Sequence, residues 1–96
     1  MLLVQTVRVP VEGIEAFREF EAAVLPLLPK YDARLERRLR TLDGRVELHV
    51  VSFPSREALD AYRADPTPQE HLHLLHESEA ATELLEVMDV TDETAT

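Results

Sequence analysis

The sequence lacks several residue types on which common protein chemistries depend. It contains no cysteine, tryptophan or asparagine, and only two glycines, Gly13 and Gly44, occur among its 96 residues. Without cysteine there can be no disulfide, thiolate metal site, iron–sulfur cluster or cysteine nucleophile. Two isolated glycines also exclude a glycine-rich phosphate-binding loop. No charge-free stretch approaches the roughly 20 residues of a membrane span, and no basic segment precedes the apolar start, so we expect a cytoplasmic protein without a signal peptide.

Positive charge is also scarce, and it is unevenly placed. The net charge is −9, which argues against nucleic acid or an anionic membrane as a partner. Residues 1–45 carry eight positive and seven negative side chains, whereas residues 46–96 carry two and twelve. The hydrophobic share of 45% indicates a folded chain. We predict one domain over residues 1–90 and a flexible acidic tail over residues 91–96.

The first half predicts a strand followed by a helix. Residues 2–9 are apolar on both alternating faces, which is typical of a strand covered on both sides. From Gly13 the period becomes 3.6, and Glu21 is assigned to the polar face of the predicted helix. The apolar stripe consists of Ile14, Phe17, Phe20, Val24, Leu27 and Leu28. Pro26 predicts a kink and Pro29 the end of the helix.

Residues 33–51 predict a β-hairpin. Asp43 and Gly44 can supply the two positive φ angles of a two-residue turn, which fixes the register of both strands. Charged and apolar side chains then separate onto opposite faces. The predicted apolar-side pairs are Leu39–Leu48, Arg37–Val50 and Thr41–Val46, and the predicted charged-side pairs are Arg40–Glu47, Arg38–His49 and Glu36–Val51.

The second half predicts two helical segments and a last strand. Ser55 can cap a helix over residues 56–64, before Asp65-Pro66. The run Thr67-Pro68-Gln69-Glu70 matches a capping box with Thr67 as N-cap and predicts a helix over about residues 71–80. Residues 83–90 return to a strand.

This order predicts a ferredoxin-like βαββαβ fold of the α+β class, a four-stranded antiparallel sheet with both helices on one face. The other face would expose apolar central strands. Because monomers rarely expose large apolar patches, we predict a symmetric homodimer.

Two segments also resemble a known superfamily. They are Leu2 to Val9 leading into Glu15-Ala16-Phe17, and the run from Phe53 to Leu59 with Tyr62 and Asp65-Pro66 after it. Over about residues 2–90 the chain resembles uncharacterised small-domain members of the dimeric α+β barrel superfamily, near the antibiotic-biosynthesis-monooxygenase-like and EthD-like groups. The resemblance implies two sheets closing into a shared barrel, with ligand clefts beside the sheet. The oxygenase and haem-degrading branches that use asparagine and tryptophan cannot be matched, since neither residue occurs.

The charged hairpin face is the first candidate site. Arg38 and Arg40 could bind a carboxylate while His49 moves a proton, with Glu47 beside them. We name His49, Arg38 and Arg40 as candidate catalytic residues. The alternative is a ladder of cross-strand ion pairs on a solvated or dimer-facing surface.

A second candidate is the histidine-rich helix. Imidazoles and carboxylates at helical spacing could bind a metal, but no known zinc or di-iron spacing is matched. The residues are Glu70, His71, His73, His76 and Glu77. We favour a solvated helix face here and predict neither a metal nor a cofactor.

A third candidate is a pocket between helices and sheet, lined by aromatic residues with Gln5 or Thr6 as a polar contact. The aromatic residues are Phe17, Phe20, Tyr31, Phe53 and Tyr62. The alternative is that these aromatic side chains simply form the core. We name Gln5, Phe17, Glu47, Phe53 and Tyr62 as candidate ligand-binding residues.

The resemblance implies that this predicted homodimer binds a small organic molecule in a cleft beside the sheet. If the protein is an enzyme, we expect cofactor-free oxygenation or isomerisation of a small organic acid. The alternative is a non-catalytic dimeric interaction or stress-related module.

Overall fold

The computed structural model describes residues 1–95 and contains one four-stranded antiparallel sheet. Its strands are β1 (Leu2–Arg8), β2 (Arg34–Arg40), β3 (Val46–Ser52) and β4 (Ala81–Val87). They lie in the order β2-β3-β1-β4, so the two central strands are β3 and β1. The predicted ferredoxin-like arrangement is confirmed.

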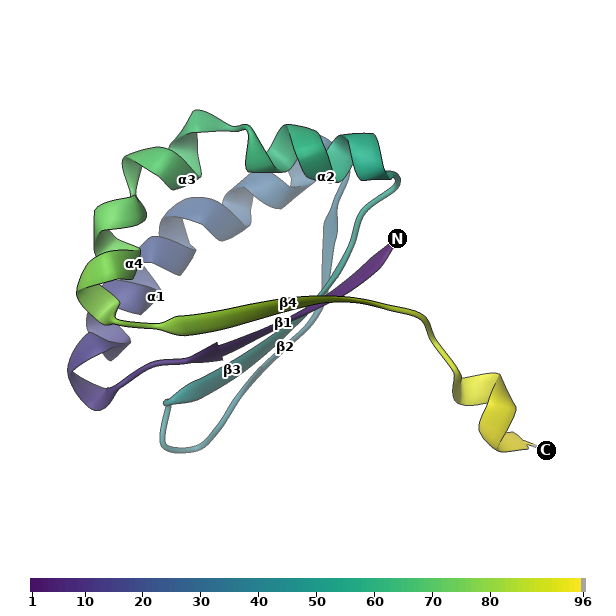
Figure 1. Cartoon of the computed structure of the whole chain (residues 1–96), viewed down its shortest axis with the longest axis horizontal. Coiled ribbons are helices and arrows are strands. Elements are labelled where there is room, and N and C mark those ends of the chain that lie inside the picture. The colour runs from purple at the N-terminus through teal and green to yellow at the C-terminus, as the bar shows by residue number, and fades with distance from the viewer. Residues whose placement is uncertain (96) are drawn as a thin grey trace.

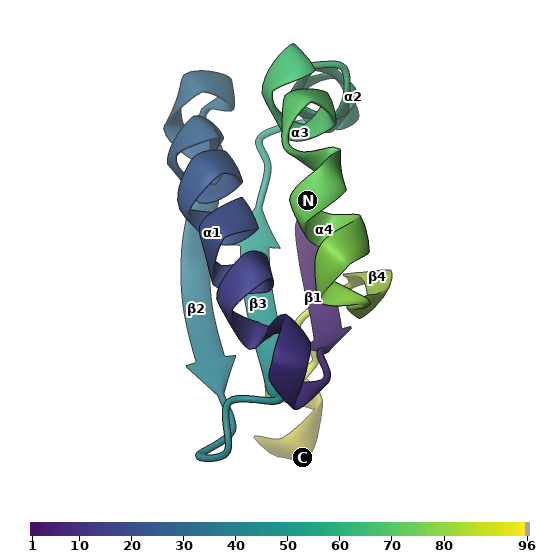
Figure 2. The same cartoon turned by 90° about the vertical axis from the view of Figure 1, so that its left-hand side faces the viewer.

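All the helices that pack on the sheet cover the same face (Figure 1), as the end-on view also shows (Figure 2). They are η1 (Val11–Gly13), α1 (Ile14–Val24), η2 (Leu25–Tyr31), α2 (Arg56–Arg63), α3 (Pro66–Glu70) and α4 (Leu72–Ser78). The opposite face of the sheet is open. A last 3-10 turn, η3 (Thr91–Ala95), extends away from the sheet (Figure 1). The proposed tail boundary stays a prediction, and Thr96 lies outside the described residues.

The long first helix changes character where its prolines begin. The α-helical part ends at Val24, and the chain continues as the 3-10 helix η2 through Pro26 and Pro29. Proline has no amide hydrogen to donate four residues back, so the tighter winding replaces the predicted kink. The carboxylate of Asp65, at the start of α3, accepts hydrogen bonds from Tyr31 and Lys30 and ties η2 to the second half of the chain.

The hairpin register is confirmed, but the turn is not the predicted one. Arg40 lies opposite Glu47 and Arg38 opposite His49, as expected. Of the two predicted turn residues only Gly44 has a positive φ, 76°, and the loop spans four residues between Thr41 and Val46. The register is preserved because four loop residues keep the same alternation as two. Asp43 instead accepts hydrogen bonds from the Thr41 hydroxyl and the Arg45 amide.

The far end of the hairpin differs as well. A bulge between Leu35 and Arg37 places Leu35, not Glu36, opposite Val51. One extra residue in a strand shifts every following partner by one position. The predicted Glu36–Val51 pair is therefore wrong.

Of the two helix caps predicted in the second half of the chain, one is confirmed. Ser55 caps α2 by accepting from the amide of Ala58, as predicted. The predicted cap at Thr67 is wrong, because Asp65 accepts from the Thr67 amide and the helix begins at Pro66. The predicted helix over 71–80 begins at Leu72 and ends at Ser78, and Glu79 turns the chain into β4 with a φ of 55°.

The core lies between the helices and the covered sheet face, in two apolar clusters. One is built around Leu3, Phe53 and Leu59, and the other around Val7 and Phe17. No helix within residues 1–95 combines the length and the apolar character that crossing a bilayer requires. Between the two clusters lie the charged side chains of the hairpin.

Candidate functional site

Strand alternation places the charged side chains of the hairpin inside the molecule. Glu47 and His49 are two residues apart on β3, on the same face as Val51, and their partners on β1 are Val7 and Gln5. That face is covered by the helices, and Glu47 and His49 are only 4% and 3% exposed. The interpretation of this face as a solvated or dimer-facing surface is therefore wrong.

The helix opposite contributes a third buried ionisable side chain. Glu21 of α1 is 2% exposed. The sequence assigned it to the polar face, and this assignment is wrong. Glu21 follows Phe17 by four residues and precedes Val24 by three, which is the spacing of one helix face. This spacing indicates a position on the buried face, whereas the charge of the glutamate side chain favours an exposed position.

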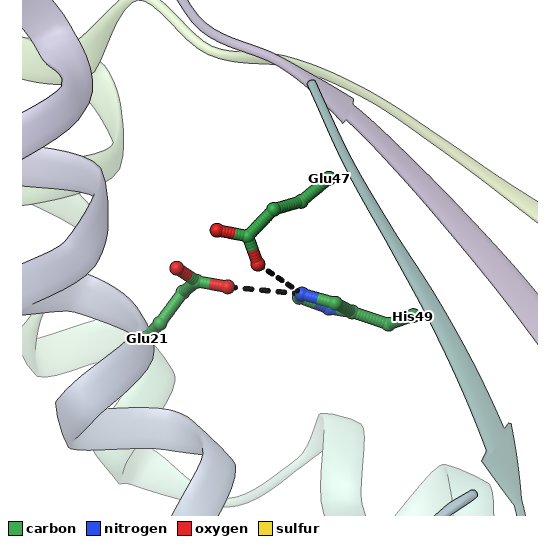
Figure 3. Close-up of side chains that lie close together, drawn as sticks. All are labelled: Glu21, Glu47 and His49. Atoms are coloured by element: carbon green, nitrogen blue, oxygen red, sulfur yellow. Dashed lines mark hydrogen bonds and ion pairs between the residues drawn. The ribbon is translucent and has the colours of Figure 1, made fainter. Parts of the chain in front are cut away.

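The three side chains meet at the imidazole of His49 (Figure 3). His49 Nε2 lies 2.8 Å from Glu47 Oε1 and 2.9 Å from Glu21 Oε2. The contact with Glu47 is a hydrogen bond, whereas Glu21 Oε2 is buried with no partner in hydrogen-bonding geometry. A single N–H donor thus stands between two carboxylates that both need it.

Two arginines of β2 complete the cluster from its outer side. Arg38 binds both acids, with Nη2 at 2.9 Å from Glu21 Oε1 and Nε at 3.1 Å from Glu47 Oε1. Arg40 Nε lies 2.8 Å from Glu47 Oε2. The two arginine side chains remain about one-third exposed, at 37% and 36%. The two carboxylates are therefore balanced by two guanidinium groups, and the net charge of the cluster depends on whether His49 is protonated.

These contacts shift the titration of the buried groups. Burial opposes the charged form of His49, but the adjacent carboxylates of Glu21 and Glu47 outweigh it and raise the pKa of His49 above its usual 6.5. Burial likewise opposes ionisation of Glu47, yet its hydrogen bonds with His49, Arg38 and Arg40 lower its pKa to about 2. The acids around His49 thus favour its protonated form.

A pocket of about 290 Å³ lies against this cluster, between the helices and the sheet. Glu21 and His49 both belong to its wall. Tyr62 also lines it, and burial, with a smaller contribution from the Asp65 charge, raises the pKa of the Tyr62 hydroxyl, so the phenol stays neutral. The other lining side chains are mostly apolar, as in pockets that bind organic molecules.

The predicted ligand-binding residues are distributed unevenly around this pocket. Gln5, Phe17, Phe53 and Tyr62 line it. Glu47 does not belong to the lining and reaches it only through His49. The sequence also predicts Phe20, Tyr31 and Thr6 at this pocket. Phe20 does line it, whereas Tyr31 binds Asp65 and Thr6 lies on the open face of the sheet.

The candidate catalytic residues are similarly divided. His49 is part of the pocket wall, whereas Arg38 and Arg40 are not, because their guanidinium groups bind Glu21 and Glu47. The anion-binding role of the two arginines stays a prediction.

The histidine-rich helix is not assembled into a comparable group. Within residues 1–95, the ionisable side chains close enough to share a metal ion are Glu21, Glu47 and His49, whose ligand atoms all lie within 4.8 Å of one another. His73 and His76 are exposed on α4.

Of the described side chains, the cluster of Glu21, Glu47 and His49 is the group that could hold a divalent cation. Arg38 and Arg40 already balance the two carboxylates, so a divalent cation on neutral His49 would leave an excess charge of about +2 in a buried place, which is costly. A proton on His49 leaves only +1. The arrangement is therefore better matched to holding and moving a proton.

Comparison with known proteins identifies the fold. No protein-family model matches the chain, and no curated protein matches it significantly. Solved structures do match over nearly the whole chain. Rv0793 from Mycobacterium tuberculosis has 22% sequence identity and a TM-score of 0.68, covering 94% of this chain and 97% of its own. The chain has a ferredoxin-like fold.

Two further solved structures are similar to this chain in fold. SnoaB from Streptomyces nogalater, a cofactor-independent oxygenase, has 15% identity and a TM-score of 0.68, with 94% of each chain covered. A dimeric ferredoxin-like protein of unknown function from Jannaschia sp. CCS1 has 22% identity and a TM-score of 0.62, with 91% and 100% covered. At these identities the likeness establishes the architecture.

Proposed function

We propose that the protein binds a small, largely apolar organic molecule in its pocket and transfers a proton to or from it without a cofactor. The observation that carries this proposal is the buried pair of Glu21 and His49 in the wall of an otherwise mainly apolar pocket. Ionisable groups are rarely buried without a role, and perturbed titration beside a pocket favours acid–base chemistry.

In this proposal Glu21 and His49 act together on the ligand. Glu21 Oε2 and His49 Nε2 are 2.9 Å apart in the pocket wall, so one ligand atom group can contact both side chains. The Glu21 carboxylate accepts a proton from an activated carbon of the ligand, and cationic His49 stabilises the negative charge left on the ligand. Glu47, Arg38 and Arg40 position the imidazole. Returning the proton to a different carbon gives an isomerisation.

Oxygenation begins with the same first step. A carbanion can give its electrons to molecular oxygen, which is both oxidant and oxygen source. One oxygen atom replaces two hydrogens on the carbon as a carbonyl, and the other leaves as water, so no further reductant is needed. The similarity to a cofactor-independent oxygenase favours this branch.

The test uses 2-indanone, a bicyclic ketone with activated methylene groups. In D₂O, the wild-type protein should accelerate loss of the methylene proton NMR signals, and His49→Ala should abolish the acceleration. Oxygen uptake measured in parallel separates oxygenation from simple exchange. His76→Ala, which removes an exposed histidine of α4, is the matched control. Exchange at equal rates with wild type and His49→Ala would contradict the proposal.

We further propose that the protein is a homodimer joined through the open sheet face. Leu39 and Leu85 lie on that face with 44% and 45% of their surfaces exposed, beside Val4 and Val50 of the central strands. An apolar surface of this kind is unfavourable in water. The Jannaschia protein is dimeric, and the same arrangement here would cover the face. A monomeric mass by light scattering at micromolar concentration would contradict it.

A non-catalytic interaction module remains the second candidate function, because residues 46–96 are strongly acidic. In that case the pocket should take up no small molecule, and the proton-exchange assay should give no signal.

A further inference from the structure

The pocket wall contains one more charged side chain, Arg63, at the end of α2. Glu21 and His49 are buried, whereas Arg63 is exposed, so we take the first two as the inner end of the pocket and Arg63 as its outer end. Most of the other lining residues are apolar. A ligand that spans the pocket would meet an acid–base pair at one end and a guanidinium group at the other.

The guanidinium group of Arg63 is free. Among the described residues it has no ion-pair or hydrogen-bond partner, although Asp60 precedes it by three residues on the same helix. Residues 46–96 contain only two basic side chains other than histidine, Arg56 and Arg63, against twelve acidic ones. Arg56 is paired with Glu86 at 2.9 Å. The unpaired cation in an acidic region is thus the one that lines the pocket.

The two arginines of β2 differ from Arg63, because both are bound to acidic side chains. Arg38 and Arg40 are engaged with Glu21 and Glu47, and neither lines the pocket. At the inner end both guanidinium groups are already bound to Glu21 and Glu47, so neither is free to bind a ligand carboxylate. At the outer end it would meet Arg63, which can donate two parallel hydrogen bonds to one carboxylate.

We propose that Arg63 selects the ligand, and that the ligand is an organic acid whose carboxylate binds Arg63 while its apolar body fills the pocket. This rests on the proposed function, because it assumes that the pocket binds a small molecule. The volume of about 290 Å³ lies at the small end of ligand pockets and suits a compact ring system. Arg63 is the last residue of α2, and α2 lies on the face of the sheet that the helices cover (Figure 2), so a dimer formed through the open sheet face would leave Arg63 accessible.

The test compares two probes of nearly equal shape, 2-naphthoate and the uncharged 2-naphthamide, by calorimetric titration at pH 7. Wild type should bind 2-naphthoate about tenfold more tightly, and Arg63→Met should abolish that preference while leaving 2-naphthamide affinity within about twofold. The matched control is Arg56→Met, which removes the other arginine of α2, outside the pocket lining. This variant should keep the preference.

Two results would overturn the assignment. If Arg63→Met and Arg56→Met reduce 2-naphthoate affinity equally, the effect comes from overall charge and Arg63 is not the selecting residue. If wild type binds both probes equally well, the pocket binds small molecules but does not select acids, and only this inference fails. If neither probe binds at millimolar concentration, the proposed function fails with it.

Discussion

The two faces of the sheet are built in the opposite sense from a simple globular protein. The face under the helices holds Glu47 and His49, each less than 5% exposed, whereas the open face presents Leu39 and Leu85 to solvent with almost half of their surfaces exposed. Charged side chains thus lie inside beside the apolar core, and apolar side chains lie outside. Burying ions costs free energy and exposing leucines costs free energy, so each arrangement needs a reason outside the stability of the monomer. We attribute the first to the pocket and the second to a second copy of the chain.

The largest effect is expected from breaking the inner face. Glu47→Gln removes the carboxylate that binds both arginines and His49, which leaves Glu21 as the one acid facing Arg38 and His49. The free energy of unfolding should fall by about 3 kcal/mol, at the low end for a buried pair because both arginines reach water. Urea denaturation measures it. A loss below about 1 kcal/mol would mean that the cluster behaves like a surface network.

The open face is tested by adding charge to it. Leu85→Glu introduces a carboxylate opposite Val4, where the proposed dimer is apolar. Light scattering should give the mass of a dimer for wild type and half of it for the variant, while circular dichroism should show the fold retained. Dimers for both proteins would place the interface elsewhere.

The inner face also predicts a dependence of stability on pH. Because the folded protein holds the His49 proton more tightly than the unfolded chain, His49 contributes stability below pH 6.5, and this is lost as pH rises through the raised pKa. Wild type should lose free energy of unfolding above pH 6.5, whereas His49→Gln should lack this component. His76→Gln, at an exposed position, should follow wild type. Parallel pH profiles for wild type and His49→Gln would refute the shifted titration.

The smallest effect is expected at an exposed ion pair. Arg56 and Glu86 lie 2.9 Å apart, but their side chains are 61% and 57% exposed. Glu86→Gln should change the free energy of unfolding by no more than about 0.5 kcal/mol, because water screens the pair. A loss as large as that of Glu47→Gln would remove the distinction between buried and exposed charge.

The sequence predicted the order of elements and the hairpin register because alternation and turn residues are local signals. It could not determine which hairpin face the helices cover. Hydrophobicity favours covering the apolar face, but the burial of Glu47 and His49 shows that the helices cover the charged face. The burial of Glu21 was visible in its spacing from Phe17, but hydrophobicity alone assigns a glutamate to solvent.

Arg63 shows a different limit of sequence reasoning. No local pattern distinguishes it from Arg56, since both lie on α2 and both are exposed. What separates them is tertiary structure: Glu86 of β4 binds Arg56, while the pocket passes beside Arg63. The partner of a surface charge is fixed by the packing of distant elements, which residue spacing does not encode.

The most direct test of the central claim is to follow all four histidine rings by NMR while 2-naphthol is added. We expect the His49 ring signals to shift saturably, whereas those of exposed His73 and His76 stay constant. Unchanged His49 signals at millimolar 2-naphthol, or equal shifts of all the histidines, would contradict the claim that the buried cluster forms the wall of a ligand site.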